Sequence, residues 1–467
     1  MATPRMSRLS VRGSYMLLAL VESLGMVGCL IIGMSLSTVH HHDAIIGTIF
    51  CLECLTFVLI VSLAMAAMGL YHTRLRGETS ELLARIFLSF LLASVAQAVL
   101  FYFVPYLNID ALAIGSALGL SFIIVCLIRY GFSQIRNTSL LKRRILVLGS
   151  GEKANYIEKK MRRQSDRQGF RVIGYMAMDG DSDTVCVTKR LNIAAGELQQ
   201  YVRDNQIEEI VIAPDQRRGT LPMNDLYRCR INGTKVSDIA SFVEQESHKV
   251  PLNMLHPSWM VYGTGYQAGN YFNYMAKRGF DLIVSAILLA VIWPVMLITG
   301  LLIKLESGPR APVLYSQQRV GYGGRPFWIY KFRSMREDAE KNGAVWAKSN
   351  DQRITAVGVF IRKYRIDELP QIFNILKGDM SFVGPRPERP EFVQGLSENI
   401  PYYGDRHQVK PGLTGWAQIC YAYGASERDA LEKLQYDLYY IKHFSILMDT
   451  MILIQTLEVV LFGKGAR

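Results

Sequence analysis

Residues 360–388, FIRKYRIDELPQIFNILKGDMSFVGPRPE, carry two adjacent acids, Asp367 and Glu368, followed at once by Leu-Pro. Proline is tolerated in the first turn of a helix, where its missing N–H has no partner to lose. We therefore expect Asp367 to be an N-cap, Glu368 to be the first helical residue, and a short helix to end near Lys377-Gly378. This arrangement places two carboxylates beside the free N–H groups of a helix start, where anions bind.

Basic residues surround this acid pair on both sides. Arg362, Lys363 and Arg365 precede it, and Arg386 follows in a Pro-Arg-Pro turn. A lone Asp-Glu-Leu-Pro is usually an ordinary cap with a solvated acid. Acids in the company of several cations are better suited to meeting a phosphate, because the cations offset the repulsion between two anions.

The surroundings resemble the bacterial sugar transferase family, the polyprenyl-phosphate hexose-1-phosphate transferases. The resemblance covers roughly residues 271–467 and, more loosely, the whole chain, as in long members that carry four membrane spans and a Rossmann-like domain. The matching motifs, in order, are KFRSM (331–335), RIT (353–355), Arg362, DELPQ (367–371), Asn374, GDMS (378–381), GPRPE (384–388) and KPGLTGW (410–416).

The resemblance implies a reaction: transfer of hexose-1-phosphate from a UDP-sugar to undecaprenyl phosphate, with release of UMP. The product would start an exopolysaccharide repeat unit, which downstream glycosyltransferases extend. The donor sugar is left open, with UDP-glucose preferred. The implied setting is the bacterial inner membrane, with the catalytic domain in the cytosol.

The resemblance also suggests roles for residues. Asp367 would be the nucleophile that forms a phosphosugar–aspartyl intermediate. Neighbouring residues on a helix point about 100° apart, so Glu368 would take a second task, holding Mg²⁺ against the diphosphate. The expected substrate-binding residues are Lys331, Arg333, Arg362, Arg365, Arg386 and, less strongly, Glu388.

Composition fits a membrane protein with anionic partners. Half of the 467 residues are hydrophobic and the formal net charge is +12. A bilayer, a phosphorylated lipid and a nucleotide sugar would all suit this charge, whereas no nucleic-acid motif is present. The seven cysteines lie mostly in apolar segments, so a disulfide framework is not expected.

Four apolar stretches come first, at about residues 15–36, 45–70, 82–104 and 111–128. Each is long enough to cross a bilayer. Lysine and arginine follow the second and fourth stretches and are absent from the other two connections. The positive-inside rule then places the N-terminus and everything after residue 129 in the cytoplasm.

A dinucleotide-type loop follows. RRILVLGS (143–150) predicts a buried strand, and GSGEKA (149–154) is a GxGxxA turn that opens a helix. Further strands are expected near residues 170–177 and 209–213, giving a Rossmann-like cytosolic domain. The acid expected about 20 residues beyond the loop is not evident, since position 171 is Arg. Whether this domain binds a nucleotide is left open.

A fifth apolar stretch, residues 280–303, is long enough to span a bilayer but would carry the Asp367 region outside. Both flanks are basic and Pro294 would break a helix. We therefore expect a re-entrant helix that enters one leaflet and returns, as the resembled family has, with a plain fifth span as the alternative. Trp293 stands where that family usually has Ser, which leaves the depth of the dip open.

The expected architecture is an α-helical transmembrane bundle (1–135), an α/β Rossmann-like domain (136–261), a linker (262–274) and an α-rich, α+β monotopic catalytic domain (275–467). A homodimer is a candidate assembly. Two other functions remain open: a membrane-anchored NAD-dependent nucleotide-sugar oxidoreductase centred on the glycine loop, and a non-enzymatic scaffold for polysaccharide assembly.

Overall fold

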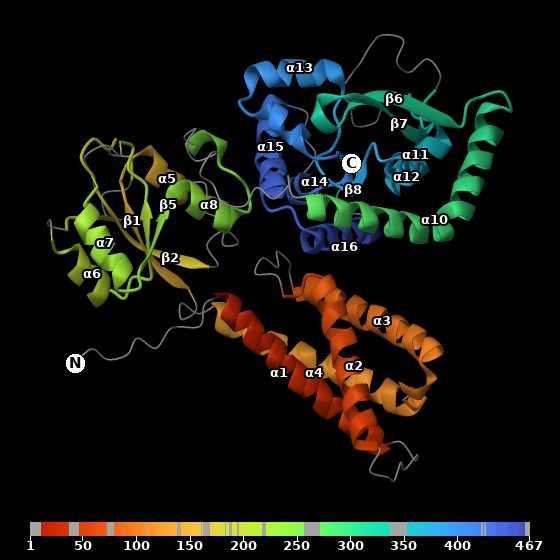
Figure 1. Cartoon of the computed structure of the whole chain (residues 1–467), viewed down its shortest axis with the longest axis horizontal. Coiled ribbons are helices and arrows are strands. Elements are labelled where there is room, and N and C mark those ends of the chain that lie inside the picture. Colours follow the sequence, from red (N-terminus) through yellow and green to blue (C-terminus); the bar gives the residue numbers. More distant parts are fainter. Residues whose placement is uncertain are drawn as a thin grey trace. The chain divides into compact units, whose positions relative to one another are not determined.

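The computed structural model divides into two compact units, residues 1–242 and 243–467. Each unit is described by itself below. Figure 1 shows the helical bundle, the sheet-containing part and the C-terminal unit. The residues that the structure describes are 11–36, 46–71, 79–107, 109–137, 142–159, 161, 169–182, 184–185, 189–193, 196–216, 221–255, 271–336, 353–421, 424 and 426–462.

The chain begins with the four expected apolar helices. They are α1 (Val11–Leu36), α2 (Ile46–Ala67), α3 (Thr79–Phe103) and α4 (Ala111–Asn137). Among the described residues, α1, α3 and α4 are each long and apolar enough to cross a membrane, while the apolar part of α2 is described over Leu52–Ala66. Leu17, Leu24 and Leu91 are among many exposed apolar side chains on these helices, as expected for surfaces that face lipid.

A buried ion pair joins α1 to α4. The Arg129 guanidinium meets the Glu22 carboxylate, with Nε 2.8 Å from Oε1, and it also donates to the Leu70 carbonyl at 2.7 Å. The Tyr71 hydroxyl donates to Glu22 Oε2 at 2.7 Å. Because charge is costly in an apolar bundle, this mutual satisfaction fixes α1, α4 and the end of α2 against one another.

A five-stranded parallel sheet follows, with strand order β3-β2-β1-β4-β5. This is the doubly wound order of a Rossmann sheet without its sixth strand, in keeping with the Rossmann-like domain that the glycine loop predicted. The strands are β1 (Arg143–Leu148), β2 (Phe170–Met176), β3 (Arg190–Leu191), β4 (Glu209–Ile212) and β5 (Lys235–Asp238). The helices are α5 (Glu152–Lys159), α6 (Leu198–Asp204), α7 (Met223–Ile231) and α8 (Ile239–Ser247).

The sequence analysis anticipated β1, β2 and β4, which have buried apolar runs, but not β3 and β5. β3 has only two residues, and β5, KVSD, has no fully buried side chain. Both lie at sheet edges, where neither length nor apolar pattern is demanded.

The second unit starts before the expected linker. Val250 is fully buried in its core and donates its N–H to Gln435 O at 2.9 Å. Glu244 pairs with Lys442 at 2.8 Å. Residues 243–255 therefore pack with the C-terminal unit, although the sequence placed them in the preceding domain. Residues 262–270 of the expected linker lie outside the described residues, and the rest of it begins α10.

The C-terminal unit is mostly helical. After η4 (Leu252–Met254) and α10 (Tyr271–Ser307) come β6 (Leu314–Val320), η5 (Tyr322–Gly324), β7 (Pro326–Phe332), α11 (Ala356–Lys363), η6 (Ile366–Glu368), α12 (Gln371–Lys377), β8 (Ser381–Val383), α13 (Pro390–Asn399), η7 (Tyr403–Gln408), β9 (Gly412–Thr414), α14 (Trp416–Cys420), α15 (Glu427–Lys442) and α16 (Ile446–Phe462). β6 and β7 form an antiparallel hairpin, and β8 pairs with β9 in parallel. Ile375, Val383, Leu434 and Ile452 form part of the core.

The helix α10 contains the fifth apolar stretch and is continuous through Pro294. The expectation that this proline would break the helix was wrong. Figure 1 shows α10 in two limbs that meet at a sharp bend, which is what proline causes when its ring displaces the preceding turn. By length and composition α10 also could cross a membrane.

Candidate active site

The acid pair does not sit at the start of an α-helix. Asp367 and Glu368 belong to the 3-10 turn η6, and α12 begins only at Gln371, with Pro370 as its N-cap. The prediction of Asp367 as an N-cap was therefore wrong. The cause is the backbone at Arg365, two residues before Asp367. Arg365 adopts the left-handed conformation (φ 54°), and the Glu368 N–H donates to the Arg365 carbonyl. The helix end was predicted correctly, at Lys377 with Gly378 (φ 97°) as the C-cap.

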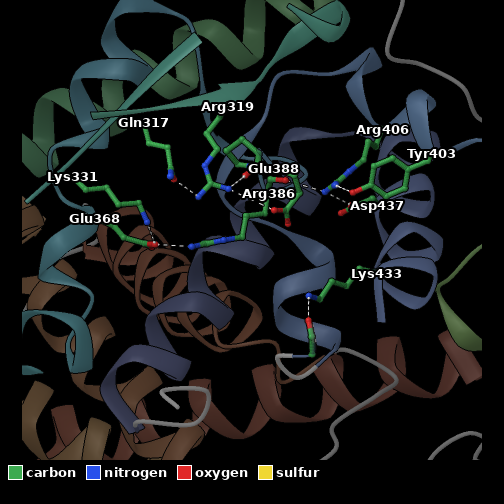
Figure 2. Close-up of polar contacts among 12 residues, drawn as sticks. Gln317, Arg319, Lys331, Glu368, Arg386, Glu388, Tyr403, Arg406, Lys433 and Asp437 are labelled. Carbon is green, nitrogen blue, oxygen red and sulfur yellow. Dashed lines mark hydrogen bonds and ion pairs between the residues drawn. The ribbon is translucent and has the colours of Figure 1, made fainter. Parts of the chain in front are cut away.

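Glu368 is buried and surrounded by three cations. Its Oε1 accepts from Lys331 Nζ at 2.9 Å and from Arg386 Nη2 at 2.7 Å, and its Oε2 lies 3.5 Å from Arg365 Nη1. Figure 2 shows Lys331 and Arg386 both reaching the Glu368 carboxylate, from different directions. Burial alone would raise the pKa of Glu368, but Arg386, Lys331 and Arg365 hold it well below its ordinary value. Glu368 is thus an ionised carboxylate that gathers positive charge at one point.

Asp367 lies beside this cluster, half-buried, and makes no ion pair with any described residue. Burial and the neighbouring Glu368 charge raise its pKa above the ordinary value, against the opposing effect of Lys331, Arg362 and Arg386. A carboxylate without a bonded cation keeps its lone pairs available for attack. Among the described residues, the geometry therefore separates the two acids: Glu368 is ion-paired and Asp367 is not.

Lys331 is brought to Glu368 by a buried asparagine. Asn374 on α12 donates from Nδ2 to Trp328 O at 2.7 Å and accepts from Tyr330 N–H at 3.1 Å, so it bonds to the backbone of β7. Lys331 is the next residue of that strand. An amide that completes a strand's hydrogen bonds from a helix sets the distance between the two elements. This explains why Asn374 belongs to the motif set.

The turn that presents Arg386 is held by two further arginines. Arg406 donates to the Arg386 carbonyl at 2.9 Å, and Arg319 donates to the Pro387 carbonyl at 3.2 Å. Arg406 is itself buried and pairs with Asp437 at 2.9 Å and with the Tyr403 hydroxyl at 2.7 Å (Figure 2). Arg386 therefore reaches Glu368 from a backbone that is braced on both sides.

This bracing was not predicted from the sequence. Arg319 and Asp437 were not named as site residues, and Arg406 was expected on the sugar or uridine side of the site, because each acts on a segment far away in the chain. The one available signal was an acid within a mostly apolar run of the sequence, Asp437 between Tyr436 and Leu438 on α15.

The other predicted site residues fall into two groups. Arg362 on α11 is near enough to lower the pKa of Asp367, and Arg365 contacts Glu368. Arg333 turns back to donate from Nε to Met335 O at 3.1 Å, and Glu388 lies 3.6 Å from Arg319. The structure thus brings Lys331, Arg362, Arg365 and Arg386 together around the acid pair, and it places Arg333 and Glu388 in contacts of their own.

Both oxygens of Glu368 face cations, and no group of three or more His, Cys, Asp or Glu side chains gathers within the described part of the chain. Mg²⁺ is commonly bound by one or two carboxylates together with substrate phosphates and water. The role of Glu368 in holding Mg²⁺ against the diphosphate therefore stays a prediction.

Asp437→Asn tests the bracing of the Arg386 turn. The change leaves the buried Arg406 without its counter-charge, and breaking a buried pair by removing one partner costs about 3–5 kcal/mol. We expect a clear fall in the thermal unfolding midpoint, measured by intrinsic fluorescence of the purified protein. Asp405→Asn is the control, because among the described residues the Asp405 carboxylate bonds to Gln408 alone, at an exposed position, and the loss of this bond should cost about 1 kcal/mol. Equal midpoints for Asp437→Asn and the unchanged chain would contradict this role.

Two family models match the chain. Residues 272–463 match the bacterial sugar transferase model, and residues 66–220 match a model described as a CoA-binding domain. The first covers the whole candidate site and the second covers the glycine loop.

Named relatives agree with the first match. An Escherichia coli UDP-glucose:undecaprenyl-phosphate glucose-1-phosphate transferase is 33% identical over 356 residues, which are 74% of each chain. An Aeromonas hydrophila UDP-N-acetylgalactosamine-undecaprenyl-phosphate N-acetylgalactosaminephosphotransferase is 44% identical over 52% of this chain, and a Komagataeibacter xylinus undecaprenyl-phosphate glucose phosphotransferase is 33% identical over 70% of it. The chain spans only 56% and 61% of these last two relatives. On the site motifs, the family match and the Escherichia coli relative, the chain belongs to the bacterial sugar transferase family.

Proposed function

We propose that this chain transfers a sugar-1-phosphate from a UDP-sugar to undecaprenyl phosphate. The observation that carries the proposal is the separation of the two acids: Glu368 holds Lys331, Arg365 and Arg386 together, while Asp367 beside them bonds to none. The names of the relatives support the same pair of substrates.

The charge of the site suits a diphosphate. Lys331, Arg362, Arg365 and Arg386 against Asp367 and Glu368 leave a formal net charge of +2. A sugar nucleotide brings two negative phosphates, which would share the cations that now face Glu368. Arginine and lysine close to a transferring phosphoryl group also stabilise the charge that develops in the transition state.

The chemistry then needs no proton transfer. A carboxylate oxygen of Asp367 would attack the phosphorus that carries the sugar, and the bond from that phosphorus to the bridging oxygen would break. UMP would leave with this oxygen and its electron pair. A phosphate oxygen of undecaprenyl phosphate would then attack the same phosphorus, releasing the Asp367 carboxylate and forming the lipid diphosphate sugar.

The membrane placement is part of the proposal. Both ends of α10 bond to the same unit: Lys277 pairs with Asp449 and Arg278 donates to Ile375 O near the start, and Glu306 accepts from Ala356 N–H near the end. A straight helix of 37 residues would be about 55 Å long and would separate its ends by more than a bilayer core. The bend and the shared anchorage support a re-entrant helix, with the catalytic unit in the cytosol at the inner membrane.

Asp367→Asn gives the decisive test of function. Membranes carrying the unchanged chain, supplied with undecaprenyl phosphate and Mg²⁺, should release UMP from one UDP-sugar, and the variant should lose at least about a thousandfold in rate, as expected when a nucleophile is removed. The donor panel includes UDP-glucose and UDP-N-acetylgalactosamine, because the names of the relatives divide between these sugars.

Each other outcome has a definite meaning. UMP release that persists in Asp367→Asn would refute the nucleophile, and no release with any donor would favour the scaffold alternative. A nicotinamide absorbance change with a UDP-sugar would favour the oxidoreductase alternative. The Mg²⁺ requirement stays a prediction, which addition of EDTA to the same assay tests.

The pH dependence of the rate provides a second test. Attack needs ionised Asp367, whose pKa is raised, so kcat/KM should fall on the acid side with a midpoint above the ordinary Asp value of about 4. Lys331→Met removes a cation that lowers this pKa, so the midpoint should move to higher pH. Lys331→Arg keeps the charge and should leave the midpoint near that of the unchanged chain. A midpoint that moves down in Lys331→Met would contradict the assignment.

The re-entrant helix is tested by labelling. Single cysteines replacing Tyr271 and Ser307, at the two ends of α10, are placed in a background with the native cysteines removed. A membrane-impermeant maleimide should label both from the cytosolic face, in inverted vesicles, and neither in right-side-out vesicles. A spanning α10 would instead give labelling of the two positions from opposite faces.

A further inference from the structure

The glycine loop of the N-terminal unit lies where a Rossmann domain normally holds a pyrophosphate. It connects β1 to α5 and contains Gly149, Ser150 and Gly151, followed by Glu152 and Lys153 at the start of the helix. In a dinucleotide site the N–H groups of such a loop point at phosphate oxygens, and a glycine lets the phosphate approach the backbone closely.

Asp215 occupies the position of that anion. It follows β4, and its carboxylate accepts from Glu152 N–H and Lys153 N–H, each at 3.2 Å. It also accepts from the N–H and the hydroxyl of Ser182, at 3.2 and 2.7 Å. Burial opposes ionisation, but the hydrogen bonds from Ser182, Lys153 and Glu152 lower the pKa of Asp215 below its ordinary value.

A second carboxylate takes another donor of the loop. Asp181, which follows β2, accepts from Ser150 N–H at 2.7 Å and from Met178 N–H at 3.1 Å, and its other oxygen accepts from Asp215 N–H at 2.9 Å. The Lys153 ammonium donates to the carbonyls of Pro214 and Asp215 at 3.3 and 3.1 Å. The cation that could meet a phosphate is therefore turned to the backbone after β4.

The space beside Gly151, the glycine that would permit close approach of a phosphate, is also filled. A Cβ placed on Gly151 would lie 2.0 Å from Asp215 Oδ2, so the space above this residue already contains a carboxylate oxygen. A diphosphate entering here would have to displace one carboxylate and lie against a second. Like charges at such distances repel strongly in a partly buried site.

We infer that this loop is closed by the chain's own carboxylates, so that the domain binds neither CoA nor a dinucleotide through it. Asp215 and Asp181 take the hydrogen bonds of the absent phosphates and tie the ends of β2 and β4 to the start of α5. The match of residues 66–220 to a CoA-binding model thus reflects the fold, and the residues at the loop do not fit the ligand. This inference is independent of the transfer reaction proposed above.

Hydrogen exchange on the full chain in lipid nanodiscs tests the inference. The amides of Ser150, Glu152 and Lys153 should exchange slowly without ligand, and millimolar CoA, NAD⁺ or inorganic phosphate should not slow them further. Asp215→Ala should speed exchange at Glu152 and Lys153 by roughly tenfold or more, because a hydrogen-bonded acceptor is lost. Inorganic phosphate should then slow exchange in this variant. Asp179→Asn, an exposed acid after the same strand as Asp181, is the control and should change nothing.

Binding to the candidate active site is separated by Arg386→Gln. CoA or NAD⁺ retained in equilibrium dialysis by both the unchanged chain and Arg386→Gln, together with slower exchange at residues 150–153, would overturn the inference. Fast exchange of these amides in the unchanged chain would overturn it as well. Both arms use the unchanged loop, so they hold even if Asp215→Ala fails to fold.

Discussion

The site depends on the buried carboxylate of Glu368, which attracts three cations and repels the neighbouring carboxylate of Asp367. Three cations from β7, from the residue before η6 and from the Pro-Arg-Pro turn would separate if Glu368 did not hold them, since like charges in a partly dry site disfavour one another. Glu368 also disfavours a charge on Asp367, the residue next to it. The surrounding hydrogen bonds keep these charges together. Asn374 joins α12 to β7, and two arginines brace the turn that carries Arg386.

Both units bind two carboxylates, but with different groups. In the C-terminal unit, four cationic side chains converge on two acids and leave a net positive charge. In the N-terminal unit, the N–H groups of Ser150, Glu152 and Lys153 converge on two acids, and the Lys153 ammonium donates to backbone carbonyls. A helix start holds the anions in the N-terminal unit, whereas cationic side chains hold them in the C-terminal unit. In the N-terminal unit the anions are side chains, because Asp181 follows β2 and Asp215 follows β4.

The sequence predicted the features that depend on neighbouring residues or on regular spacing. Apolar runs predicted the four N-terminal helices, the strand–turn–helix pattern predicted the Rossmann-like sheet, and ordered motifs predicted the family. Residues 360–388 did not predict that Arg365 would adopt a left-handed conformation and that the acids would lie in a 3-10 turn, because residues other than glycine rarely adopt this conformation. Arg406, which bonds Arg386 from 20 positions away, and Asp215, which bonds the glycine loop from about 60, carry no local signal.

The two limbs of α10 contact the elements that carry the charged residues of the site. Arg278, in its first limb, donates to the carbonyls of Ile375 and Leu376 at the end of α12, the helix that follows the acid pair. Ile303, in its second limb, packs with Phe332 of β7 and Ile361 of α11, the elements that carry Lys331 and Arg362. One helix therefore touches both sides of the site from its two ends. Straightening α10 at Pro294 would pull these contacts apart, so the bend also holds the cations in place around Glu368.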